Sequence, residues 1–212
     1  KLNKNKSHLI QKLSILSSLT CGLNSGEYMP WFASGYGAEL PDNQIIDDSE
    51  SLVFDSNKLK NNYVILGKTS LTVELSSNKN FGMIATRLCE INENGDSNLV
   101  TFGILNFNQI NGKNINYKIK ANKKYKVNLN LNDTGYAFKK NNKIRISIST
   151  SYWPMAWPLP EKFKLTIYLK NSFIELPKRT NLIKYNLFKK PEQSKPISYN
   201  QIIEPKRLRQ IS

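Results

Sequence analysis

Few residues in this chain could carry out hydrolysis. Nucleophilic serine catalysis needs a hydroxyl, a base that takes its proton and usually an acid that orients the base. The only histidine is His8, which lies in a lysine-rich leading segment with no nucleophile pattern beside it. The closest approach to a G-x-S-x-G nucleophile elbow is the stretch FASGY at 32–36, where Phe32 stands in place of the first glycine. We therefore predict that the chain holds no catalytic triad and no catalytic residue of its own.

A serine and a lysine could act together without histidine. Ser76 and Lys79 have the S-x-x-K spacing. In enzymes that use it this motif opens a helix, whereas here it follows an apolar strand pattern. We interpret it as a polar turn.

Candidate metal ligands are equally sparse. Cys21 and Cys89 are too few and too far apart for a zinc site or a disulfide framework, so we interpret both as buried thiols, a usage that favours a reducing, cytoplasmic compartment. The acidic residues between positions 42 and 50 could offer oxygen ligands to calcium, but their spacing matches no EF-hand. The simpler interpretation is a solvated acidic loop or one paired with lysines. We predict no metal and no cofactor.

The most distinctive segment covers residues 149–160 and reads STSYWPMAWPLP. Its prolines forbid a continuing central strand, so it forms a loop that carries Tyr152, Trp153 and Trp157. The Gly- and Pro-punctuated stretch 21–50 is too long for a simple connection, and we expect its Trp31 and Phe32 to dock onto a neighbouring surface. These five aromatic residues are candidates for an interdomain or substrate-side face, or for a sugar-stacking platform. The alternative is that they cap a core.

The net charge of +15, from 31 basic and 16 acidic residues, invites a nucleic-acid or anionic-membrane interpretation. The lysines are spread through turns and strand ends among many asparagines and isoleucines, and no nucleic-acid-binding motif is present. No run approaches the roughly 18 apolar residues of a membrane-spanning helix. We therefore expect neither nucleic acid nor membrane as a partner.

The elements that position these residues are predicted to be strands. From residue 51 onward, runs rich in branched and aromatic residues alternate with Asn, Gly, Lys and Asp. Gly67 predicts a break or bulge, and Asn94-Gly95 predicts a two-residue hairpin. Isoleucines 144, 146 and 148 alternate with polar residues expected to face water. The predicted strands cover 51–54, 63–75, 82–91, 99–107, 124–131, 144–148, 163–169 and 172–176.

About eight strands with almost no helical periodicity predict an all-β, two-sheet β-sandwich. The long connections favour a jelly roll over an immunoglobulin-like sandwich. We expect a leading segment at 1–20 that ends a preceding region, a jelly-roll domain at 21–177, and a basic extended tail or the start of a following segment at 178–212.

Several segments together resemble the C-terminal domain of the X-Pro dipeptidyl-peptidase and bacterial cocaine esterase family of serine hydrolases. They are GAELPDNQ at 37–44 with Asp47-Asp48, ATRLCE at 85–90 with the Asn94-Gly95 turn, GILN at 103–106 and KIRISISTSYWP at 143–154. The likeness covers about residues 20–177 and is specific in combination.

The resemblance implies a galactose-binding-like jelly roll that packs against an α/β-hydrolase domain, in the same parent chain or an associated one. It implies that the parent is a serine hydrolase of dipeptidyl-peptidase or esterase type, whose Ser-Asp-His triad lies upstream of the matched region. None of that triad transfers to this chain, which we expect to be part of a longer protein. A homo-oligomer stays open.

Two functions follow. The first is a non-catalytic accessory domain that helps to shape the hydrolase's active-site cleft. The second is a free-standing β-sandwich binding module, for example for carbohydrate, that uses the same aromatic residues.

Overall fold

The computed structural model describes residues 11–26, 40–110, 112 and 117–180. Ten strands dominate this part of the chain. They are β1 (Lys12–Ile15), β2 (Leu52–Asp55), β3 (Tyr63–Gly67), β4 (Ser70–Ser77), β5 (Met83–Ile91), β6 (Ser97–Asn106), β7 (Tyr125–Asn130), β8 (Thr134–Phe138), β9 (Lys143–Ser149) and β10 (Leu165–Glu175). The helical elements are short: α1 (Ile45–Ser49) and the 3-10 turns η1 (Leu23–Ser25) and η3 (Phe107–Gln109).

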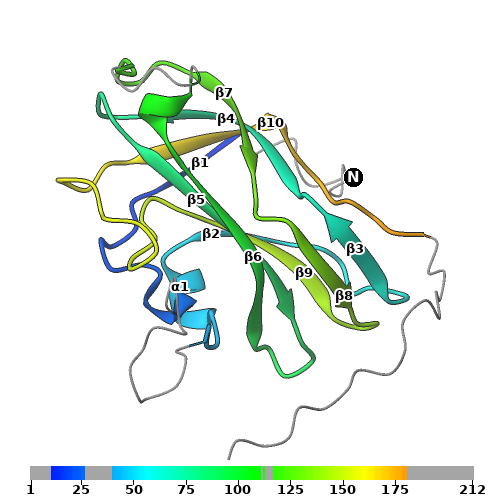
Figure 1. Cartoon of the computed structure of the whole chain (residues 1–212). Helices are drawn as coiled ribbons and strands as arrows, with labels where there is room; N and C mark the ends of the chain where they lie inside the picture. The colour runs from blue at the N-terminus through cyan, green and yellow to red at the C-terminus, as the bar shows by residue number, and fades with distance from the viewer. Residues whose placement is uncertain (1–10, 27–39, 111, 113–116, 181–212) are drawn as a thin grey trace, which may run out of the picture. The chain divides into compact units, whose positions relative to one another are not determined.

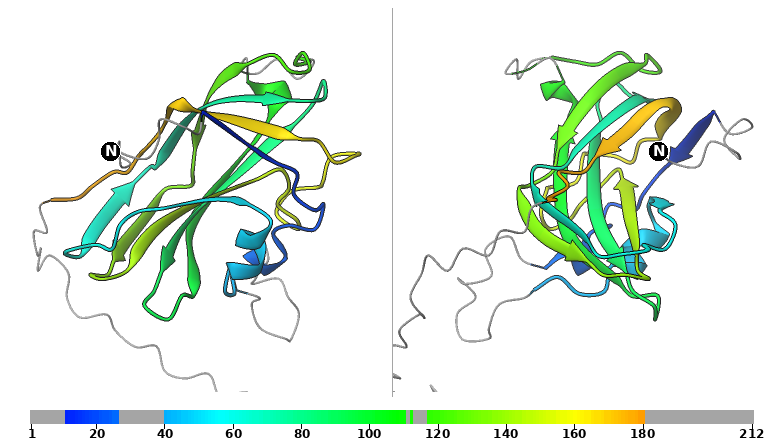
Figure 2. Two further views of the ribbon diagram at one scale, coloured as in Figure 1. Left: turned by 180° about the vertical axis from the view of Figure 1, so that it is seen from behind. Right: turned by 90° about the vertical axis from the view of Figure 1, so that its right-hand side faces the viewer.

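The strands form two antiparallel sheets with the orders β1-β10-β4-β7 and β2-β9-β5-β6, while β3 pairs with β8 (Figure 1). The views from behind and from the side show the two layers (Figure 2). If β3–β4 and β7–β8 are each counted as one interrupted strand, the resulting eight strands form two nested Greek keys, in which consecutive strands change sheet except at the β5–β6 hairpin. This is jelly-roll connectivity, which confirms the predicted all-β jelly roll.

The core between the sheets is built by alternating side chains. In β7, Tyr125, Val127 and Leu129 are buried and the residues between them are exposed. Core side chains from the opposite sheet, such as Leu88 and Ile146, belong to the same cluster. Burial stabilises the fold by about 1.5–3 kcal/mol for each large apolar side chain.

The polar face of β9 is not in water, contrary to the sequence prediction. Ser147 and Ser149 are 1% exposed, and every residue of β5 is buried. The reason is that α1 and the segment before it cover the outer face of this sheet, where Ser147 donates a 2.6 Å hydrogen bond to Asp48 of α1.

Two predicted turns are present, one of them in a different form. Gly67 ends β3 with φ 115° and separates it from β4, as predicted. The β5–β6 hairpin turns at Asn94-Gly95, but only Gly95 has positive φ, and the connection extends from Asn92 to Asp96. It is therefore longer than the predicted two-residue turn, because Asn92 closes it by bonding to Asp96 through both backbone and side chain.

Gly103 of β6 lies directly against the end of β7. A Cβ at this position would meet the backbone oxygen of Asn130 at 2.6 Å. The backbone N–H of Asn132 donates to the carbonyl of Phe102 at 2.9 Å. The β7–β8 connection therefore rests directly on β6, and glycine permits the contact.

The first strand lies upstream of the domain boundary expected at residue 21. β1 pairs with β10 from Lys12 opposite Tyr168 to Ile15 opposite Leu165, so residues 12–15 belong to the sheet. The rest of the expected leading segment before residue 11 and the tail after residue 180 lie outside the described residues. No helix in the described part is long and apolar enough to cross a membrane.

Candidate interdomain surface

The helix α1 has an inverted distribution of polarity. Its apolar residues Ile45 and Ile46 are 48% and 66% exposed, whereas Asp47 and Asp48 are 3% and 5% exposed. A surface helix normally buries its apolar side and exposes its charges. The inversion shows that the sheet beneath α1 binds the carboxylates and leaves the isoleucines outward.

Asp48 is held by four side chains from three strands. Its Oδ1 accepts from Arg87 of β5 at 3.0 Å and from Ser147 of β9 at 2.6 Å. Its Oδ2 accepts from Ser97 of β6 at 2.7 Å and from Arg145 of β9 at 3.0 Å. The buried carboxylate is therefore paired and hydrogen-bonded on both oxygens, which is the condition for keeping a charge in the interior.

Asp47 ties α1 to the segment around η1. Its Oδ1 accepts from the backbone N–H of Gly22 at 2.8 Å, and its Oδ2 accepts from the N–H of Asn24 at 3.1 Å. The guanidinium of Arg87, 1% exposed, lies 3.4 Å from the same carboxylate. One buried arginine thus serves both aspartates, and through them it fixes η1 and α1 on the sheet.

The environment of this cluster perturbs neighbouring groups. Burial raises the pKa of the Cys89 thiol to about 12, and the charge of Asp48 adds to the shift. The pKa of Arg145 is raised well above its usual range, chiefly by its hydrogen bonds to Asp55, with burial acting in the opposite direction and Asp48 adding to the rise. Arg145 is therefore a fixed cation between α1 and β2.

Tyr152 anchors the loop that follows β9. Its ring is completely buried and packs on Phe102 of β6 with 5.1 Å between centroids. The guanidinium carbon of Arg87 lies 5.9 Å from the Tyr152 ring centroid, so the loop and the buried cluster are in contact. Burial, the largest cause, raises the pKa of the Tyr152 hydroxyl well above its usual range.

Gly22 lets the loop and the η1 segment come together. The backbone N–H of Trp153 donates to the carbonyl of Cys21 at 2.9 Å. Gly22 has φ 113°, and a Cβ there would meet the backbone oxygen of Trp153 at 2.6 Å. Only glycine fits this conformation and this contact.

Outward from these anchors lies a set of exposed or partly buried apolar side chains that we call the apolar end. Trp157 is 83% exposed and packs edge-on against Trp153, with ring centroids 5.2 Å apart. In Figure 1 and in the rear view of Figure 2, α1 and the β9–β10 connection lie on the same side of the domain. The apolar end consists of Leu23, Leu40, Ile45, Ile46, Trp153 and Trp157.

The five aromatic candidates from the sequence have different positions. Tyr152 is an internal anchor, and its side chain does not reach the surface. Trp153 is partly buried and Trp157 is exposed. Trp31 and Phe32 lie outside the described residues. Within the 149–160 loop, Tyr152 therefore caps the sandwich core, and Trp157 is exposed.

The serine–lysine pair considered from the sequence does not form in the described ranges, and the acidic residues near position 47 have other partners than expected. Lys79 is ion-paired with Glu161 at 2.9 Å, and the Ser76 hydroxyl is 3.2 Å from the hydroxyl of Tyr168. The two are thus bonded to other partners and form no serine–lysine pair. The acidic residues expected to be solvated or paired with lysines instead include the buried Asp47 and Asp48, which bond to arginines. Among the described residues there is no group of three metal-ligating side chains.

Sequence reasoning missed the buried cluster and the exposed leucines and isoleucines. One signal was available: Ile45-Ile46-Asp47-Asp48 places two apolar and two acidic residues on one helical turn. Such a turn must expose one of the pairs. The arginine that selects the acidic pair for burial is about forty positions away in the sequence, at Arg87, so the choice depends on long-range pairing.

The fold and this surface together define a jelly-roll domain with an apolar face beside a buried ionic cluster. The sequence matches the family model of the X-Pro dipeptidyl-peptidase C-terminal non-catalytic domain over residues 11–189, and the chain belongs to this family. A comparison with curated protein sequences finds no match.

Solved structures agree with the fold. An aminopeptidase from a marine sediment Thaumarchaeota archaeon matches with TM-score 0.70, 13% identity and 80% of this chain covered. An α-amino acid ester hydrolase matches with TM-score 0.66, 13% identity and the same 80% coverage. A CocE/NonD family hydrolase from Staphylococcus aureus matches with TM-score 0.51, 12% identity and 62% coverage. The match spans 33%, 33% and 31% of these three proteins, so the chain corresponds to about a third of their length.

Proposed function

We propose that this domain packs its apolar end against an α/β-hydrolase catalytic domain of the same parent protein and helps to shape that domain's active-site cleft. The observation that carries the proposal is α1, which exposes Ile45 and Ile46 while it buries Asp47 and Asp48. Exposed apolar side chains gathered on one side of a domain mark an interaction site. Trp157, at 83% exposure, is the kind of anchor that dominates binding energy at interfaces.

The parent activity that we propose is acyl hydrolysis of an ester or amide bond by a serine nucleophile. Family membership and the three hydrolases that share the fold support this proposal. The serine, histidine and acid would belong to the catalytic domain. This domain's contribution would be a rigid wall, because the buried cluster holds η1, α1 and the 149–160 loop in fixed positions.

A sugar-stacking platform receives less support from the same residues. Stacking on a pyranose uses aromatic faces that are presented side by side, whereas the Trp153 and Trp157 rings meet edge-to-face at 69°. Tryptophan fluorescence during glycan titration tests this alternative, since a platform gives saturable quenching and an interdomain face gives none.

The decisive experiment compares two exposed apolar residues in the parent enzyme. Ile46→Asp introduces a charge into the apolar end, and Leu66→Asp introduces the same charge on β3, where Leu66 is 52% exposed and lies on the other side of the domain from α1. We expect Ile46→Asp to lower hydrolase activity and to make the junction between the domains sensitive to limited proteolysis. Leu66→Asp should leave both unchanged. Equal behaviour of the two variants would contradict the proposed docking face.

A further inference from the structure

Seven lysines meet at the end of the sandwich where β4 turns into β5. They come from three segments that are far apart in the sequence: 78–80, 118–124 and 161–164. In Figure 1 the β4–β5 turn and the start of β7 lie at the upper left, above α1. We call this region the basic end, and its lysines are Lys79, Lys118, Lys120, Lys123, Lys124, Lys162 and Lys164.

Hydrogen bonds of the backbone hold the three segments together. The N–H of Asn122 donates to the carbonyl of Ser77 at 2.6 Å. The N–H of Asn78 donates to the carbonyl of Lys164 at 3.1 Å, and the N–H of Lys164 donates to the side-chain oxygen of Asn78 at 2.7 Å. The lysines therefore project from a frame that fixes where their charges lie on the domain.

Most of the positive charge at the basic end is not neutralised. Glu161 is the only acidic residue within the three segments, and it pairs with Lys79 at 2.9 Å. The other ion pairs of the described residues lie elsewhere in the domain. Six of the seven lysines are exposed, and Lys79 is half-buried. Such a concentration of one sign of charge attracts a partner of the opposite sign.

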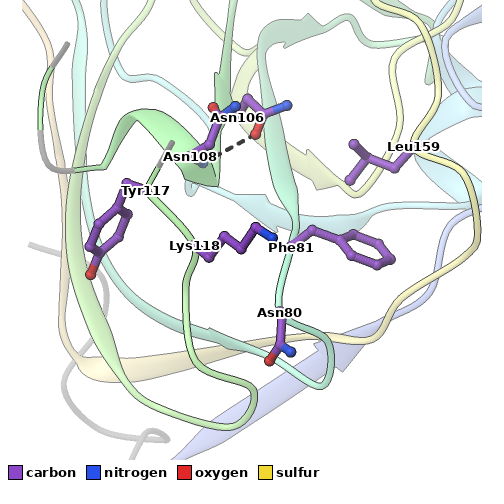
Figure 3. A pocket seen from close by; sticks show the side chains of 7 residues that line it. All are labelled: Asn80, Phe81, Asn106, Asn108, Tyr117, Lys118 and Leu159. Carbon is purple, nitrogen blue, oxygen red and sulfur yellow. Dashed lines mark hydrogen bonds between the residues drawn. The ribbon is translucent and has the colours of Figure 1, made fainter. Parts of the chain in front are cut away.

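The basic end spreads its charge over a surface and does not concentrate it in a pocket. A pocket of about 690 Å³ opens here. Figure 3 shows that Asn80 and Asn106, which line it, lie on opposite sides of Lys118. Their amides therefore do not converge with the lysine on one small anion. A partner that fits the basic end must itself carry negative charge over an extended area.

The residue types favour lipid headgroups over nucleic acid. The three segments contain no arginine, the residue whose planar guanidinium binds phosphates in two-pronged fashion. The neighbouring aromatic rings are covered, since Nζ of Lys123 lies 5.6 Å from the ring centroid of Tyr125 and Nζ of Lys124 lies 4.0 Å from that of Tyr168. These rings are thus not presented for stacking with bases.

The same residue types also argue against a protein partner. Lysine is a strongly hydrated point charge on a flexible stem, and it is depleted in protein–protein interfaces. Clusters of four to eight basic residues are instead typical of surfaces that contact anionic lipids, where the headgroups and the ammonium groups stay hydrated.

The basic end has no large apolar side chain to insert into a bilayer. The two large apolar residues within its segments, Ile119 and Phe163, are 3% and 2% exposed. A contact with lipid at this end would therefore stay at the level of the headgroups. Its attraction would be electrostatic, and salt would weaken it.

We propose that the basic end is a peripheral contact for an anionic lipid surface. The lysines attract negatively charged headgroups while the sandwich stays in water. Along the sequence the lysines are spread over many turns, which is why no membrane partner was expected there, but the fold brings seven of them together. The proposal does not depend on the interdomain role, because none of the seven lysines belongs to the apolar end.

Flotation of the whole chain with lipid vesicles tests the proposal. We expect vesicles that contain phosphatidylglycerol to carry the chain upward, and vesicles of phosphatidylcholine alone to leave it behind. Sodium chloride should release the bound chain, because it screens the charges. Equal binding to both kinds of vesicle, or no binding to the anionic ones, would overturn the proposal. Tighter binding to duplex DNA than to anionic vesicles, at equal phosphate concentration, would overturn the choice of lipid.

Two variants that lose the same charge locate the contact, and both keep residues 181–212. The first carries Lys118→Gln, Lys120→Gln, Lys162→Gln and Lys164→Gln. The second carries Lys60→Gln, Lys68→Gln, Lys139→Gln and Lys170→Gln, at four exposed lysines outside the basic end.

The first variant should bind anionic vesicles about a hundredfold or more weakly, because each lysine near a charged bilayer contributes roughly fivefold. The second variant should bind nearly as tightly as the unaltered chain. Circular dichroism checks that both are folded. Equal weakening in the two variants would mean that net charge alone attracts the chain, and the assignment to the basic end would be wrong.

Discussion

Arg87 of β5 and Asp48 of α1 form an ion pair in which Nη2 lies 3.0 Å from Oδ1 and both side chains are almost completely buried. The pair joins a central strand to a helix 39 residues earlier in the chain. Because the same guanidinium also faces Asp47, its removal would take an ion-pair partner from two buried carboxylates at once.

We expect Arg87→Met to lower the free energy of unfolding by about 3–5 kcal/mol, the usual loss when one partner of a buried pair is removed. Urea unfolding followed by circular dichroism measures it. Lys79→Met breaks the exposed pair with Glu161 and should cost about 1 kcal/mol or less. A similarly small loss for Arg87→Met would show that water reaches the cluster.

Because α1 buries its aspartates and exposes its isoleucines, substitutions of the aspartates should cost more stability than substitutions of the isoleucines. Asp48→Ala removes a carboxylate that satisfies Arg87, Ser97, Arg145 and Ser147, so this variant should lose several kcal/mol of unfolding free energy. Ile46→Ala removes a side chain that is 66% exposed and should change stability by about 0.5 kcal/mol or less. Thermal unfolding of the two variants gives the comparison, and the reverse order would contradict the placement of α1.

Gly103→Ala should destabilise the domain by about 1–3 kcal/mol, because the added methyl group meets the backbone oxygen of Asn130 at 2.6 Å. Gly135→Ala is the matched control in β8. There the added methyl group meets only the end of the flexible Leu66 side chain, at 3.2 Å. The denaturant midpoint of Gly103→Ala should therefore be clearly lower than that of Gly135→Ala.

The burial of the Cys89 thiol predicts that the free energy of unfolding depends on pH in the alkaline range. Burial raises the pKa of this thiol from 9.0, the ordinary value of a free thiol, to about 12 in the folded chain, so between these values the folded state keeps the proton while the unfolded state loses it. The contribution of this thiol is therefore constant below about pH 9 and declines as the pH rises from about 9 to 12. The pH dependence of unfolding should be shallower in Cys89→Ala over this window. Identical slopes in the two proteins would show that the thiol is exposed.

The local pattern of apolar and polar residues was sufficient to predict most strands of the sandwich. Tyr125, Val127 and Leu129 alternate with polar residues and form a strand with one buried and one wet face, as their spacing predicts. The same rule failed for β9, where Ser147 is buried. Alternation reports which side chains are apolar, and it cannot report that a distant helix will cover the polar side.

The candidate surface was only partly predictable for a related reason. Trp157 could be placed on a loop because prolines interrupt the strand pattern, and the structure exposes it. Tyr152 has the same local signals, yet it is buried because Phe102 and Gly22 leave room for its ring. The difference between the two depends on partners more than forty residues away, which no short motif encodes.

All nine residues of β5 are buried, on both faces of the strand. A strand with a single buried face can accept substitutions at every second position, as β7 can. β5 contacts the core on one side and the α1 layer on the other, so both sets of positions are constrained. Mutational tolerance in this domain should therefore be lowest along β5, and random libraries that spare this strand should yield the highest fraction of folded variants.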